Sequence, residues 1–163
     1  MSSTVFIPGK IVPGNLTEPM SLSLLNFIKG NWPDSTALVK STDIKFSTLW
    51  WDGYGSYQVH FLDRYIQRQP YVLGWNMDYA EDYVDLHIFV RKNSPTRPLE
   101  LDDIKRSAES LIMPFRRNVP QIQTGAACMK ILRTYDEPIR TFVTDLWHSV
   151  LQVYIQYYVA TTS

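Results

Sequence analysis

The sequence predicts a single α+β domain, in which a mostly antiparallel sheet is covered by two amphipathic helices. Two segments, near residues 17–29 and 102–115, repeat apolar residues with the helical period. Other segments alternate apolar and polar residues and are rich in β-branched and aromatic side chains, as strands are. The chain has 163 residues, 45% hydrophobic and 20% charged, so it can bury one ordinary core.

Residues 1–16 are expected to form an extended arm, because proline and glycine recur at positions 8, 9, 13 and 14. The domain itself is expected over 17–163. Its first helix begins near Thr17, a suitable N-cap, and ends at Gly30. The apolar stripe of this helix consists of Met20, Leu24, Phe27 and Ile28.

A strand, a turn and a second strand follow. Residues 44–50 alternate, residues 52–55 read Asp-Gly-Tyr-Gly, and residues 57–62 alternate again, which predicts a hairpin. Residues 63–70 are polar and fit no single element. Residues 83–91 predict a strong strand. One of its faces carries Val84, Leu86, Ile88 and Val90, and the other carries Asp85, His87 and Arg91.

The second helix is expected over 102–115, with Asp102 as its cap and Pro114 ending its regular hydrogen bonding. Residues 126–134 predict another strand, and residues 145–160 predict a long last strand. At about 3.3 Å per residue the last strand extends past about 40 Å, which is longer than a small sheet needs. We therefore expect part of it to pair with another subunit.

Composition and charge exclude several classes of function. Sixteen basic and sixteen acidic residues cancel, which disfavours direct nucleic-acid binding. Cys128 is the single cysteine, so an intramolecular disulfide is impossible, and its apolar surroundings predict a buried, inert thiol. We expect neither a signal peptide nor a membrane span, and thus a protein of the cytoplasm.

No catalytic pattern emerges from the sequence. His60, His87 and His148 belong to no HExxH motif, and neither a nucleophile elbow nor a phosphate-binding glycine loop is present. Asp85 and His87 share a strand face, which a solvated sheet surface explains without a metal. We therefore expect no catalytic residues, metal, cofactor or small-molecule substrate.

Two alternatives remain open. Pro33-Asp34 precedes Asp43-Ile44-Lys45 by a short interval, in the manner of the PD-(D/E)xK nucleases. There, Asp34 and Asp43 would hold Mg²⁺ while Lys45 assists the attacking water. The other alternative is a small, non-catalytic adaptor domain.

Large aromatic side chains exceed what a domain of this size can bury. Aromatic residues are 13% of the chain and crowd residues 50–57 and the last strand. Such side chains are enriched at protein interfaces, and arginines after the second helix can meet an acidic neighbour. The predicted subunit contacts are Trp50, Trp51, Tyr54, Tyr57, Arg116, Arg117, Trp147, Tyr154 and Tyr158.

This layout resembles the tail-terminator and neck (head–tail connecting) proteins of tailed viruses. The resemblance covers about residues 17–160 and lies in the order of elements. These are a leading helix, strands over 44–50 and 57–62, the strand 83–91 leading into the helix 102–115, and closing strands ending over 147–159.

The resemblance implies a structural virion protein that is assembled in the host cytoplasm. Its copies would form a homo-oligomeric ring, often hexameric, which caps the tail tube and docks it to neck or connector proteins. Such families carry no catalytic residues. The arm and a loop over 63–79 would contact neighbouring rings. Residues 64–82 depart from the family pattern, because they are longer and richer in aromatics than a simple hairpin link.

Overall fold

A computed structural model describes residues 5–7, 10–12, 20–50, 55–70, 77–91, 98–113, 125–136 and 146–160, and gives the backbone alone at 5–7, 10–12, 65–70, 77–80, 125–128 and 157–160. Its helices are α1 (Met20–Gly30) and α2 (Leu99–Ile112), with a short 3-10 turn η1 (Ser41–Asp43). Its strands are β1 (Val5–Ile7), β2 (Lys10–Val12), β3 (Lys45–Ser47), β4 (Tyr57–Pro70), β5 (Met77–Arg91), β6 (Gly125–Asp136) and β7 (Leu146–Ala160).

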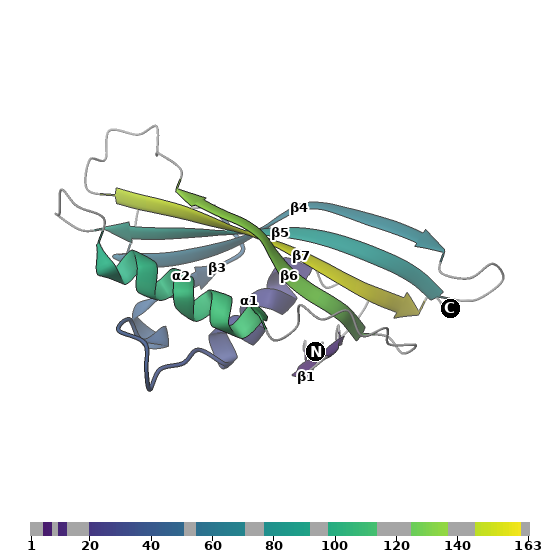
Figure 1. The fold of residues 1–163 in the computed structure, drawn as a ribbon, viewed down its shortest axis with the longest axis horizontal. Coiled ribbons are helices and arrows are strands. Elements are labelled where there is room, and N and C mark those ends of the chain that lie inside the picture. Colours follow the sequence, from purple (N-terminus) through teal and green to yellow (C-terminus); the bar gives the residue numbers. More distant parts are fainter. Residues whose placement is uncertain are drawn as a thin grey trace.

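The expected α+β architecture is confirmed. In the described part of the chain, five strands form one sheet in the order β3-β4-β5-β7-β6, and β3–β4 is its parallel pair. Figure 1 shows α1 and α2 on one side of this sheet, with the strands running on past them. The long C-terminal strand is also confirmed as β7.

The predicted hairpin over residues 44–62 is wrong. Lys45, Phe46 and Ser47 pair in parallel with β4, so the chain crosses over before β4 begins. The described part of the crossover carries Leu49 and Trp50 onto the sheet face opposite the helices. A local turn signal shows that the chain bends, but it does not set the direction in which the next strand runs.

Two further expectations about the strands are corrected. Residues 63–70 and 77–79 of the predicted loop are strand, because β4 continues to Pro70 and β5 begins at Met77, and residues 71–76 lie outside the described part. The last strand also does not reach past its own sheet. All 15 residues of β7 pair with β5, and Ser149 to Tyr158 pair with β6 on the other side. The length of β7 is therefore matched by equally long neighbours within the chain.

Bulges interrupt β4 and β6, whereas β5 and β7, which lie between them in the sheet, pair without a bulge. Arg64 is an extra residue in β4 opposite β5, and Ala127 and Leu132 are extra residues in β6 opposite β7. The pairing of β5 with β7 runs without a shift. A bulge bends its strand and increases its twist, so the interior of the sheet is regular while the strands on either side are kinked.

Both helices lie close to where they were predicted, with local differences. Pro98, not Asp102, is the N-cap of α2, and Asp102 lies in the first turn, where a carboxylate suits the helix dipole. Helix α1 buries more than its apolar stripe. Ser21 and Ser23 are also buried, and the Ser21 hydroxyl donates a hydrogen bond of 2.6 Å to Oδ2 of Asp63 on β4.

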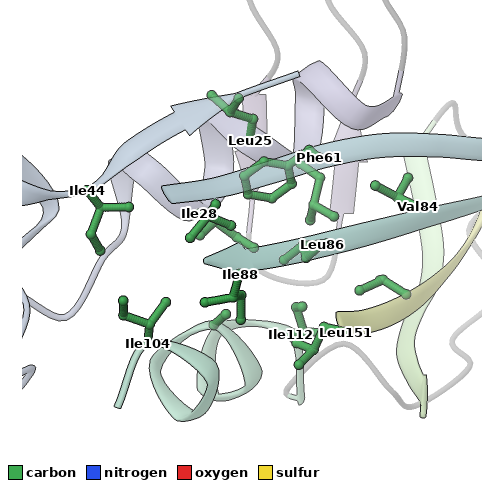
Figure 2. Close-up of a cluster of buried hydrophobic side chains, with 14 of the residues drawn as sticks. Leu25, Ile28, Ile44, Phe61, Val84, Leu86, Ile88, Ile104, Ile112 and Leu151 are labelled. Atoms are coloured by element: carbon green, nitrogen blue, oxygen red, sulfur yellow. The ribbon is translucent and has the colours of Figure 1, made fainter. Parts of the chain in front are cut away.

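One hydrophobic core joins the two helices to the sheet. Figure 2 shows Ile28 of α1 and Ile104 of α2 converging with side chains of β4 and β5. Phe61, Leu86 and Leu151 follow one another across β4, β5 and β7, and all three are fully buried. This single core fixes which residues of the sheet must face the other way.

Two segments of the expected arm are strands. Strands β1 and β2 form an antiparallel hairpin, with Val5 opposite Val12, and β2 lies beside β6 without joining its sheet. The boundary drawn at residue 16 stays a prediction, because residues 13–19 lie outside the described part.

Candidate functional site: a buried histidine layer beneath Trp50

The face of the sheet opposite α1 and α2, here called the far face, carries all three histidines of the chain. The register sets His60 of β4 opposite His87 of β5, and Phe89 of β5 opposite His148 of β7. The histidines alternate with core residues, so they point away from the helices. They are nevertheless buried, with exposed fractions of 1% for His60, 9% for His87 and 6% for His148.

His87 and His148 are joined directly by a hydrogen bond. Nδ1 of His87 lies 2.9 Å from Nε2 of His148. The ring planes differ by 21° and the ring centroids are 5.1 Å apart, so the rings lie nearly end to end. One nitrogen must donate its proton and the other must accept with a lone pair. The bond therefore excludes the state in which both rings are imidazolium.

The ring of Phe89 packs nearly parallel to these two rings. Its ring stacks on His148 at a centroid distance of 4.4 Å and an angle of 7°, and it is tilted by 16° from His87. We call His87, Phe89 and His148 the ring layer. In this arrangement the rings contact one another through their apolar faces, and the polar nitrogens of the histidines lie at the ring edges.

Trp50 stands upright on the ring layer. Its plane is at 72° to His87, 88° to Phe89 and 89° to His148, with centroid distances of 4.8, 5.8 and 6.4 Å. The residue remains 54% exposed. Part of the indole is therefore held by buried rings, while the rest faces solvent.

His60 holds the segment that carries Trp50. Nδ1 of His60 donates to the carbonyl oxygen of Leu49, and Nε2 lies 2.7 Å from the Oε1 position of Gln58. Both partners would then be acceptors, which a neutral imidazole cannot satisfy. Turning the Gln58 amide over lets its nitrogen donate to Nε2, and this gives the buried Gln58 Nε2 a partner that it otherwise lacks among the described residues.

Burial sets the protonation of His60. Desolvation of the ring lowers its pKa below the ordinary value of 6.5, the bond to Leu49 opposes that change, and the charge of Lys45 adds to it. A neutral His60, donating through Nδ1 and accepting through Nε2, is therefore the form that fits these neighbours.

The expectation of a solvated surface around His87 is wrong. His87 is buried because Trp50 and the rings of neighbouring strands cover it. Asp85 is largely buried too, and its Oδ1 lies 3.6 Å from Nε of Arg64. The alternation of the strand correctly placed both residues on one face. It could not bring in His60 and His148, because the register between distant strands cannot be read from local sequence.

Beyond the ring layer, cations lie over tyrosine rings on the same face. Arg64 lies over Tyr83 at 5.3 Å, Tyr83 meets Tyr154 edge-on at 5.3 Å, and Lys130 lies over Tyr154 at 5.2 Å. Farther along β6, the Arg133 guanidinium lies 4.6 Å from the centroid of Tyr135, and its Nε donates to Gln152. These cations already interact with side chains of the same chain. We therefore interpret this row of tyrosines and cations as side chains that cover the far face of the sheet.

The predicted subunit contacts fall into three groups. Trp50 is largely exposed, whereas Tyr57 and Trp147 are partly buried and pack against the chain's own core. Tyr154 is partly buried within the tyrosine row. The remaining residues, Trp51, Tyr54, Arg116, Arg117 and the side chain of Tyr158, lie outside the described part, as does the side chain of Cys128.

The residues of the nuclease-like motif have local structural roles. The Asp34 carboxylate accepts hydrogen bonds from the Ser41 amide at 2.7 Å and the Ser41 hydroxyl at 2.8 Å, which lower its pKa. Asp43 lies in η1, and Lys45 is exposed on β3. Among the described residues, no group of three or more His, Cys, Asp or Glu side chains is arranged to hold a metal ion.

Comparison with known proteins adds no relative: no protein-family model matches the chain, and a search of curated proteins finds no match. Neither helix of the described part combines the length and the apolar character that crossing a bilayer requires.

Proposed function

We propose that this chain is a structural virion protein, a tail terminator or head–tail connecting protein whose copies form a homo-oligomeric ring. In this role it would close the tail tube and meet neck or connector proteins during assembly in the host cytoplasm. The proposal rests on large apolar side chains exposed in two pairs, one on each side of the sheet.

The first pair is on the far face. Leu49 is 73% exposed and is followed by the half-exposed Trp50. The Leu49 carbonyl is held by His60 and the Trp50 ring by the ring layer, so both residues are fixed in place without being covered. A fixed and exposed aromatic residue beside a leucine has the composition of an interface anchor.

The second pair is in the helix layer. Leu38 is 68% exposed and Leu99 is 74% exposed. One hydrogen bond joins the segments that carry these two leucines. The amide of Val39, the residue after Leu38, donates at 3.1 Å to the carboxylate of Asp103, which lies one helical turn after Leu99. This pair therefore lies on the opposite side of the sheet from Leu49 and Trp50.

Different patches on opposite sides favour head-to-tail association. When one patch of each copy meets the other patch of the next copy, the contacts continue from copy to copy, and they form a closed ring where the rotation between copies brings the last one back to the first. The zero net charge of the chain provides little long-range repulsion against such self-association.

The test compares the intact chain with two variants that each lose one patch. By light scattering, the intact chain is expected at about six times its mass of 19.0 kDa. Leu49→Asp, and separately Leu38→Asp with Leu99→Asp, should each give monomers. A mixture of these two variants should give dimers and nothing larger, since every mixed pair retains one intact contact.

Leu132→Asp is the matched control, because Leu132 is also an exposed leucine but lies in a bulge of β6, away from both patches. It should form rings like the intact chain. An intact chain that stays monomeric at all concentrations contradicts the proposal, and so does a mixture that contains monomers alone.

A further inference from the structure

We propose that the His87–His148 pair is an acid-sensitive latch, which seats Trp50 while the two rings share a proton and releases it when both rings are protonated. The latch itself stands on the geometry of the ring layer. Its effect on assembly rests on the proposed function, because Trp50 belongs to the far-face contact.

The order of proton uptake follows from the hydrogen bond. In the neutral pair, the donor ring carries no proton on its outer nitrogen, so a first proton can bind there while the bond remains and becomes charge-assisted. The acceptor ring already carries its proton on the outer nitrogen. Its other nitrogen is the one that accepts the hydrogen bond. A second proton must therefore break the bond.

The surroundings of the pair then act against two charges. Two imidazolium groups would face each other where the nitrogens are now 2.9 Å apart, in a site that is nearly closed to water. The described titratable and charged groups on the far face around the pair are Lys45 on β3, His60 and Arg64 on β4, Asp85 and Arg91 on β5, and Arg133 and Tyr135 on β6. Asp85 favours a first proton, but it already lies beside Arg64, which limits its support for a second.

Trp50 senses this change because it contacts every ring of the layer. Its edge-on contacts need the rings of His87, Phe89 and His148 to stay nearly parallel. Once the two imidazoles separate and hydrate, the surface beneath the indole is lost. His60 is not the latch, because a protonated His60 still donates through Nδ1 to the Leu49 carbonyl.

Histidine ordinarily changes charge between about pH 5 and about pH 8, and the second proton needs a lower pH here because the two charges oppose each other. Acrylamide quenching of tryptophan fluorescence is therefore measured from about pH 7.5 down to about pH 4, and the signal of a Trp50→Phe variant is subtracted to isolate Trp50. Quenching of Trp50 in the intact chain is expected to increase on acidification. The double variant His87→Asn with His148→Gln places amide groups where Nδ1 and Nε2 now lie, so it keeps a hydrogen bond but cannot titrate. It should lose the increase.

His60→Asn is the matched control, because it removes the third histidine of the far face, leaves the pair intact and places an amide that can still donate to the Leu49 carbonyl, so the increase on acidification should persist. If the double variant fails to fold, the single variant His148→Gln gives the same test, since one remaining histidine cannot form a doubly charged pair. An intact chain whose Trp50 quenching does not change with pH, or a folded pair variant that still shows the increase, overturns the latch.

Oligomeric state is recorded in parallel by light scattering, which separates the two proposals. A monomer that releases Trp50 in acid supports the latch and contradicts the ring. A homo-oligomeric ring in which Trp50 quenching does not change with pH supports the proposed function and contradicts the latch.

Discussion

At the scale of single residues, the three histidines of the far face differ in their hydrogen-bond partners. His87 and His148 share one bond with each other, while His60 is bonded to Leu49 and Gln58. Only His60 is therefore held entirely by groups that do not titrate. The protonation of His60 can therefore be followed through the free energy of unfolding.

Folding should be less stable in mild acid because of His60. Its pKa is lowered in the folded chain, mainly by desolvation, so between the unfolded value near 6.5 and the folded value the unfolded chain binds more protons. The contribution of His60 is thus complete above about pH 6.5 and declines as the pH falls toward the folded pKa. Urea unfolding at a series of pH values measures this.

The comparison for this prediction is His60→Gln. The variant should show a shallower decline of the free energy of unfolding with falling pH than the intact chain. Equal slopes in both proteins would contradict the prediction, because other titrating groups are common to the two.

At the scale of elements, the start of β4 depends on one backbone conformation. Gly55 has φ of +83°, in the region that favours glycine, and it precedes Tyr57, the first residue of β4. An added Cβ would lie 3.6 Å from Nε2 of Gln58, which is ordinary contact. The cost of a side chain at this position is therefore conformational and not steric.

Gly55→Ala should destabilise the fold by about 1–2 kcal/mol, the cost of a left-handed conformation in a residue with a side chain. Chemical denaturation provides the measurement. Gly30→Ala is the matched control. Gly30 is the last residue of α1, and an added Cβ there meets nothing within 4 Å. This control should be neutral or should stabilise by up to about 1 kcal/mol. Equal effects at both positions would contradict the argument.

The elements themselves were largely predictable from sequence, since hydrophobic period is a local property. The stripes of α1 and α2 and the alternation in 83–91 all identify elements that the structure contains. The parallel β3–β4 pair was not predictable, because a turn signal does not encode strand direction. The extension of β4 over polar residues was also missed, since its pairing partner β5 stabilises it there.

The candidate site was less predictable than the fold. Trp50 was singled out as a subunit contact, which stays a prediction, and His87 was placed on the correct strand face. The layer itself depends on cross-strand register, which joins positions 60, 87 and 148 through pairings far apart in the chain. Polar residues in apolar strands were the available signal: His60, His87 and His148 each interrupt a run of strand-forming residues.

At the scale of the whole molecule, one core connects every layer. Phe61 of β4 is fully buried in a cluster with residues of α1, α2 and the other long strands. A loss of packing there is felt by both helices at once. The described domain should accordingly unfold as one unit.

Phe61→Ala should lower the free energy of unfolding by about 3–5 kcal/mol, through lost burial and the cavity left behind. Leu132→Ala, at an exposed bulge, should change it by no more than about 0.5 kcal/mol. Urea denaturation of both variants tests the contrast. Circular dichroism and tryptophan fluorescence should give one coincident transition, and separate transitions would show that helices and sheet are not held by a common core.

The kinks at Arg64, Ala127 and Leu132 have a consequence for how copies can meet. They lie in β4 and β6, on either side of the β5–β7 pair, whose register is unbroken. A sheet edge with bulges is a poor template for an incoming strand. Neighbouring molecules therefore have little opportunity to pair their strands through backbone hydrogen bonds. Contacts between copies that are made by side chains alone can dissociate again. A misplaced copy can then leave a growing assembly before the ring closes.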